Sequence, residues 1–233
     1  MIYLAEMIGT AILVLLGDGV VANVVLNKTK GNNSGWIVIT VGWACAVLIP
    51  ALMFGRISNA HFNPALTLGL ACIRKIGWND AFLYILSQFL GAFIGACLVY
   101  IIYKDHFDAT ADRDSKLSVF CTGPAIRNIP FNFISEFIGT FILVFAIIAF
   151  NAVAFADGLG TFGVGGIILV IGICLGGTTG YAINPARDLG PRIAHFLLPI
   201  KDKRDPDWSY SWVPVIAPIC GAILAALLGN AIF

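Results

Sequence analysis

The chain has 233 residues, of which 59% are hydrophobic and 12% are charged, and its formal net charge is +1. Soluble domains carry about 25% charged residues, so this composition excludes an ordinary soluble protein and indicates an integral membrane protein. A net charge this close to zero gives no reason to expect a nucleic-acid partner.

Six stretches are long and apolar enough to cross a bilayer, which takes about 20 residues. The predicted spans lie near residues 3–26, 36–54, 80–103, 131–154, 163–182 and 211–232. Two further apolar stretches, 64–73 and 185–198, are too short to span and are predicted to be half helices. The predicted fold is therefore all-α, with six transmembrane helices and two half helices.

The two halves of the sequence are internal repeats. The segment around Glu6 returns around Glu136, 130 residues later, and the Asn-Pro-Ala box at Asn63 returns at Asn184. Each half has three spans and one half span, an odd number of full crossings, so the two units must have opposite orientations. The half helices are then predicted to meet, N-terminus to N-terminus, near the middle of the membrane. The predicted organisation is a first repeat over 1–103, a connecting loop over 104–130 and a second repeat over 131–233.

The two Asn-Pro-Ala boxes are suited to begin helices. Asparagine is a good N-cap, and proline is favoured at the first helical position. Each asparagine side-chain oxygen can cap its half helix while the amide NH₂ group remains free to donate into a pore. The predicted box residues are Asn63, Pro64, Ala65, Asn184, Pro185 and Ala186.

Three carboxylates lie inside predicted spans, where an ionisable residue is a functional-site candidate. The duplicated Glu6 and Glu136 are predicted to brace the half helices by accepting backbone N–H bonds, with proton coupling as the alternative. For Asp18, a structural role and a role in transport both remain open. His61 is predicted to anchor the loop before its half helix, because no second metal ligand is nearby.

With these boxes in place, the whole chain resembles the major intrinsic protein family, the aquaporins and glycerol facilitators. The paired boxes in inverted repeats, the second followed by Arg187 and Asp188, carry the resemblance. Asp188, Arg192 and the pair Pro214-Val215 at the start of the last span resemble the glycerol-conducting branch. The resemblance implies an aquaporin-like bundle of six tilted helices, assembled as a homotetramer with one pore in each chain.

The same resemblance places the family's selectivity constriction at Trp43, Gly172, Tyr181 and Arg187. Strict water channels carry a histidine where Gly172 stands, whereas glycerol facilitators commonly combine tryptophan, glycine, phenylalanine and arginine. Tyr181 departs from that pattern, and its hydroxyl could line or narrow the opening. The expected constriction offers an apolar corner and a fork of donors, which suits a polyol.

The function expected from the sequence is a passive transmembrane channel for glycerol and water that excludes ions and protons. The alternative is an ion- or proton-coupled secondary transporter, which also uses inverted repeats and broken helices. No nucleophile–base pair, metal cluster or phosphate loop is present in the sequence, so we expect no enzyme activity, catalytic residue, metal or cofactor. The expected partners are glycerol, water, other small neutral solutes and membrane lipid, and the expected location is the plasma membrane.

Overall fold

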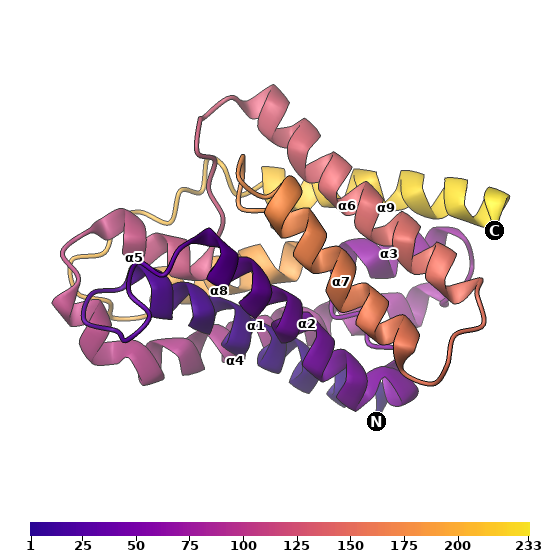
Figure 1. The fold of residues 1–233 in the computed structure, drawn as a ribbon, viewed down its shortest axis with the longest axis horizontal. Helices are drawn as coiled ribbons and strands as arrows, with labels where there is room; N and C mark the ends of the chain where they lie inside the picture. Colours follow the sequence, from indigo (N-terminus) through magenta and orange to yellow (C-terminus); the bar gives the residue numbers. More distant parts are fainter.

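The computed structural model describes all 233 residues, folded as nine α-helices without strands (Figure 1). In chain order the helices are α1 (Ile2–Val25), α2 (Trp36–Ser58), α3 (Pro64–Cys72), α4 (Trp78–Ala109), α5 (Arg113–Phe120), α6 (Ile129–Asn151), α7 (Leu159–Cys174), α8 (Pro185–Leu197) and α9 (Val213–Ile232). Five of them, α1, α2, α4, α6 and α9, are long and apolar enough to cross a membrane. The predicted all-α membrane fold is confirmed.

The fifth predicted span is shorter than the sequence pattern indicated. Helix α7 has 16 residues and ends at Cys174, whereas the prediction ran to residue 182. At about 1.5 Å per residue it covers roughly 24 Å, less than the hydrocarbon core. The chain then turns back, and Gly180 adopts a φ of +85°, which a helix cannot accommodate. Residues 175–182 are apolar because they approach the interior of the bundle, not because they continue the helix.

The predicted connecting loop over 104–130 contains more helix than expected. Helix α4 runs six residues past the predicted end at 103, to Ala109, and α5 follows after a short break. The Asp112 carboxylate caps α5 by accepting hydrogen bonds from the backbone N–H groups of Asp114 and Ser115. Because α5 is short and polar, the search for apolar spans could not detect it.

The two half helices, α3 and α8, begin at the predicted prolines and pack crosswise. Helix α3 lies against α9, and α8 lies against α4, so each half helix is held by a long helix of the other half of the chain. A β-carbon added at Gly69 would lie 2.9 Å from the Ala222 carbonyl oxygen, and one added at Gly190 would lie 2.7 Å from the Ala92 β-carbon. These approaches leave no room for a side chain at either glycine.

The long helices of each half also repeat one contact. Helix α1 packs against α4, and α6 packs against α9. A β-carbon at Gly91 would overlap the Met7 carbonyl oxygen, and one at Gly221 would overlap that of Phe137, 130 residues later in both members of the pair. Figure 1 shows the two chain ends towards one end of the molecule and α5 towards the other, as an even number of crossings requires.

Candidate functional site

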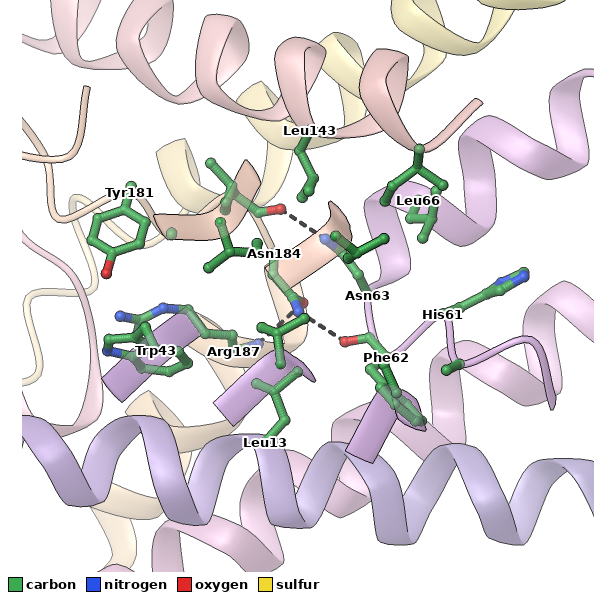
Figure 2. Close-up of a pocket in the computed structure, with 18 residues that line it drawn as sticks. Leu13, Trp43, His61, Phe62, Asn63, Leu66, Leu143, Tyr181, Asn184 and Arg187 are labelled. Atoms are coloured by element: carbon green, nitrogen blue, oxygen red, sulfur yellow. Dashed lines mark hydrogen bonds between the residues drawn. The ribbon is translucent and has the colours of Figure 1, made fainter. Parts of the chain in front are cut away.

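The two half helices meet at hydrogen bonds that cross between their boxes (Figure 2). The Asn63 side-chain N–H donates to the carbonyl oxygen of Ile183 at 2.8 Å, and the Asn184 side-chain N–H donates to that of Phe62 at 2.8 Å. Each asparagine therefore binds the residue that precedes the other one. The N-terminal ends of α3 and α8 consequently face each other at one level.

Each asparagine also caps its own half helix. The Asn63 side-chain oxygen accepts from the N–H of Ala65 at 2.9 Å, and the Asn184 oxygen accepts from that of Ala186 at 3.0 Å, with proline at the start of both helices. The sequence prediction left both amide NH₂ groups free to donate into a pore. That detail is wrong, because one of the two hydrogens on each group is used by the crossing bond.

The turns that lead into the half helices share an unusual backbone. Ala60 and Phe62 have φ values of 48° and 47°, and the corresponding Tyr181 and Ile183 have values of 38° and 44°. Residues other than glycine rarely adopt this region, and each such conformation costs on the order of 1–3 kcal/mol. The surrounding structure must therefore hold both turns in place.

Glu6 of α1 holds the first turn. Its carboxylate accepts from the backbone N–H of His61 at 3.0 Å and of Phe62 at 2.8 Å. The Ser58 hydroxyl and the Gln88 amide also donate to it, at 2.6 and 2.8 Å. The predicted bracing by Glu6 is confirmed, and the buried charge is matched by four donors.

Glu136 of α6 holds the second turn in the same way. It accepts from the backbone N–H of Ala182 at 3.0 Å and of Ile183 at 2.9 Å, and from the Thr179 hydroxyl at 2.6 Å. The predicted bracing is confirmed here too. Both carboxylates are fully engaged by donors of the turns that they hold, and this arrangement favours the structural role over proton coupling.

His61 contributes to the first turn through both its backbone and its ring. The ring Nδ1 lies 3.1 Å from the Thr67 hydroxyl of α3, and the ring packs 5.0 Å from that of Tyr84. These contacts agree with the predicted role of His61 as an anchor of its loop.

Two cavities follow one another through the bundle. The first, called here the vestibule, has a volume of about 360 Å³ and lies between the C-terminal end of α1, the N-terminal end of α2 and residues 118–125. The second, called the channel, has a volume of about 60 Å³ and passes both boxes. Three residues line both cavities, namely Trp43, Tyr181 and Arg187. The structure thus brings three of the four predicted constriction residues to the junction of the two cavities, as Figure 2 shows beside the boxes.

Arg187 lies across the Trp43 ring at this junction. Its Cζ atom is 4.0 Å from the ring centroid, and its Nη1 atom is 4.0 Å from an oxygen of Asp18. The opposite side of the Trp43 ring lies against α1, where a β-carbon at Gly17 would overlap the ring. The guanidinium is therefore held flat against the wall formed by α1 and α2.

Gly172, the fourth predicted constriction residue, lines neither cavity. A β-carbon there would lie 2.9 Å from Cζ and 3.0 Å from the hydroxyl oxygen of Tyr181, so the tyrosine ring already occupies the adjoining space. The Gly172 carbonyl accepts from the Trp36 indole N–H at 3.0 Å, and the Trp36 ring meets that of Tyr181 edge to face at 5.8 Å. Gly172 acts by leaving room for Tyr181, and Trp36, which the sequence reasoning missed, supports the same ring.

The residues that resemble the glycerol branch lie behind the constriction. Asp188 and Arg192 form a fully buried ion pair at 2.8 Å. Thr122 bonds to both, because its N–H and hydroxyl donate to Asp188 at 2.7 Å and its carbonyl accepts from Arg192 at 2.9 Å. Pro214 and Val215 lie in the first turn of α9. These residues attach α8 to the segment after α5 and do not line the channel.

The channel also has an apolar side that the sequence reasoning missed. Side chains from α1, α2, α6 and α7 form it, opposite the boxes (Figure 2). Single leucine or isoleucine residues in a span carry no signal that distinguishes a channel wall from lipid contact. The residues are Leu13, Val47, Leu143, Ile147, Val164 and Ile168.

Comparisons with known proteins agree with this geometry. The sequence model of the family described as "Major intrinsic protein" matches residues 2–228. A "Probable glycerol uptake facilitator protein" of Thermotoga maritima is 57% identical over 232 residues, covering 100% of this chain and 99% of that protein. A "Glycerol uptake facilitator protein" of Streptococcus pneumoniae is 53% identical, covering 96% of this chain and 95% of that protein. The X-ray structure of an aquaglyceroporin from Plasmodium falciparum superposes with a TM-score of 0.86 at 32% identity, covering 97% of this chain and 93% of that one.

Proposed function

The chain belongs to the major intrinsic protein family, and from this premise we propose that it forms a passive transmembrane channel for glycerol and water that excludes ions and protons. It is an integral, multi-pass protein of the cell membrane. The observation that carries the proposal is the junction of the vestibule and the channel at Trp43, Tyr181 and Arg187. A solute crossing the bundle must pass between these three side chains.

The walls of the channel match the two sides of a polyol. Leu13, Leu143 and Ile168 face the carbon edge, while Arg187 and the boxes supply donors for hydroxyl groups. A solute that leaves water must recover its hydrogen bonds, because an unsatisfied polar group in an apolar environment costs several kcal/mol. Glycerol recovers them on one side and needs no partner on the other. A water molecule needs only the polar side.

Cations meet positive charge along the whole path. The N-terminal ends of α3 and α8 each carry about half a positive charge from the helix dipole, and both point at the boxes. Arg187 adds a full charge at the constriction. Neutral solutes meet only donors there, so we propose that these groups form the barrier to ions and protons.

We propose that Trp43, Gly172, Tyr181 and Arg187 act together as the selectivity filter. Trp43, Tyr181 and Arg187 line the opening, and Gly172 sets the position of Tyr181. Asp188, Arg192, Pro214 and Val215 then act as supports of α8 and α9. We further propose that residues 1–103 and 131–233 are the two inverted repeats, since the contacts of Gly91 and Gly221 recur 130 residues apart.

We also propose that the protein has no catalytic activity and assembles as a homotetramer with one pore in each chain. Permeation needs no bond to be made or broken. Bulky apolar side chains such as Phe82, Ile101 and Phe131 are exposed on the outer helix faces, and they suit contact with lipid or with another copy. Cross-linking in native membranes tests the assembly, and a dominant dimer would contradict it.

The experiment that tests the channel is solute flux in proteoliposomes. Stopped-flow light scattering measures water and glycerol permeability, and we expect both to exceed those of empty liposomes. The coupled-transporter alternative predicts that a proton or sodium gradient drives glycerol above equilibrium, whereas a passive channel stops at equilibrium. Accumulation above equilibrium, or glycerol flux no greater than that of empty liposomes, would contradict the proposal.

A further inference from the structure

Asp18 is a buried carboxylate whose role is not explained by the half-helix turns. It lies in α1 with no exposed surface, and neither side-chain oxygen has a hydrogen-bond partner in the protein. It lines neither the vestibule nor the channel. An ionised carboxylate in such surroundings costs several kcal/mol unless an opposite charge compensates for it.

The other buried charges in the bundle are already satisfied. Glu6 and Glu136 accept backbone N–H bonds of their turns, and Asp188 and Arg192 pair with each other at 2.8 Å. What remains is one positive and one negative group. Arg187 is that positive group, and its Nη1 atom lies 4.0 Å from an Asp18 oxygen.

The two neighbours Gly17 and Asp18 hold Arg187 from different directions. Gly17 allows the Trp43 ring to lie against α1, and the guanidinium stacks on that ring with its Cζ atom 4.0 Å from the centroid. Asp18 attracts the same guanidinium from behind, on the side away from the cavities. Stacking alone lets a planar group slide over the ring, whereas a fixed charge selects one position.

We propose that Asp18 is a positioning residue of the selectivity filter: it is the counter-ion that draws Arg187 against the α1 wall and keeps the opening wide enough for glycerol. Without this charge the guanidinium moves towards the lumen. The opening then narrows for a three-carbon solute before it narrows for water. The inference rests on the proposed function, because glycerol flux is its readout.

The first test compares Asp18→Asn with wild type in proteoliposomes. The asparagine keeps the size of the side chain and removes its charge. We expect the ratio of glycerol to water permeability to fall by about threefold or more, the lower end of coupling between contacting groups. The ratio is independent of the amount of folded protein, so a loss that is only structural leaves it unchanged. Asp157→Asn is the matched control, because Asp157 is exposed and paired with Arg56 far from the filter, and its ratio stays at the wild-type value.

The second test asks whether Asp18 acts through Arg187. In an Arg187→Val background, we expect Asp18→Asn to leave the ratio unchanged, because the group that it positions is gone. An unchanged ratio in Asp18→Asn alone overturns the proposal. An equal fall in the two backgrounds also overturns it. If wild type itself conducts no glycerol, the proposed function fails, which is a different result from failure of this inference.

A stability measurement covers the case in which Asp18→Asn alone does not fold. Removing Arg187 leaves the Asp18 charge buried without compensation, so we expect Arg187→Val to unfold at a lower temperature than the double variant with Asp18→Asn. The measurement is thermal unfolding of purified protein in detergent. A double variant no more stable than Arg187→Val would show that Asp18 carries no charge that Arg187 compensates, and would overturn the proposal.

Discussion

Asn63 donates its side-chain N–H to the carbonyl oxygen of Ile183 at 2.8 Å, across the junction of the two half helices. The same side chain caps α3 through its oxygen. One residue thus links a helix start to the turn before the other half helix. The predictions below separate such linked roles.

The first prediction concerns Asn63→Asp. The carboxylate still accepts the cap bond from Ala65, but it cannot donate to Ile183 and leaves that buried carbonyl unpaired. We expect a loss of about 1–3 kcal/mol in stability. The added negative charge at the meeting point of two positive helix ends also weakens cation exclusion. Thermal unfolding and a proton-leak assay with a pH-sensitive dye measure the two effects, and a leak equal to wild type would contradict the proposed barrier.

The second prediction concerns Glu136→Gln. A glutamine has one acceptor oxygen in place of two, so at least one of the bonds from Ala182, Ile183 and Thr179 is lost. The strained turn at Ile183 then relaxes, and we expect the water and glycerol permeabilities to fall together. Asp80→Asn, at the start of α4, is the control for loss of one carboxylate. Normal passive flux in Glu136→Gln would show that the turn holds its shape without the carboxylate.

The third prediction compares two glycines of α1. A β-carbon at Gly17 overlaps the Trp43 ring, whereas one at Gly19 meets nothing within 4 Å. We expect Gly17→Ala to push Trp43 and its stacked Arg187 towards the lumen, to reduce glycerol flux more than water flux, and to cost about 1–3 kcal/mol in stability. Gly19→Ala is the matched control and behaves as wild type. Equal flux in the two variants would mean that Trp43 does not depend on this contact.

The fourth prediction concerns the filter ring that Gly172 admits. Gly172→His must displace Tyr181, because even a β-carbon comes within 2.9 Å of that ring. We expect a much larger loss of glycerol permeability than of water permeability, since water needs the smaller opening. Tyr181→Phe keeps the ring and removes a hydroxyl that has no partner in the protein, so its glycerol flux stays close to wild type. Stopped-flow light scattering on the same liposomes reads both solutes, and equal losses in Gly172→His would exclude Gly172 from selectivity.

The fifth prediction concerns pH and the loop outside the bundle. Burial alone would raise the pKa of the Asp207 carboxyl, but hydrogen bonds from Arg127 and Ser209 lower the pKa below its ordinary value of 3.8. An acid with a depressed pKa stabilises the folded state above its unfolded pKa, and this contribution is lost as the pH falls through the folded value. We expect Asp207→Asn to be less stable than wild type at neutral pH by about 1 kcal/mol or less. The two unfolding temperatures then converge below pH 3.8, and a constant difference over that range would contradict the assignment.

Much of this architecture could be predicted because its signals are local and duplicated. The Asn-Pro-Ala boxes define the starts of α3 and α8, and the two glutamates define the braces. The end of α7 could not be predicted, because residues 175–182 are as apolar as the helix before them. Hydropathy does not distinguish a buried turn from a span.

The constriction was predicted in identity more accurately than in geometry. Trp43, Tyr181 and Arg187 line the opening, but Gly172 lies behind Tyr181, and Trp36 supports the ring from a position that reads only as the start of a span. A contact between residues 136 positions apart leaves no trace in a single sequence. The link between Asp18 and Arg187 was invisible for the same reason.

The crossing hydrogen bonds have a consequence for how the protein is made. Asn63 and Phe62 are synthesised about 120 residues before the carbonyl and the amide that they bind. Membrane insertion proceeds from the N-terminus, so the first half helix enters the bilayer with an unpaired amide and carbonyl at its end, which is costly there. Those groups are satisfied only after α7 has turned back and Asn184 has entered. The water-conducting path is therefore completed at the end of biogenesis, and a nascent chain halted before Asn184 has no finished pore.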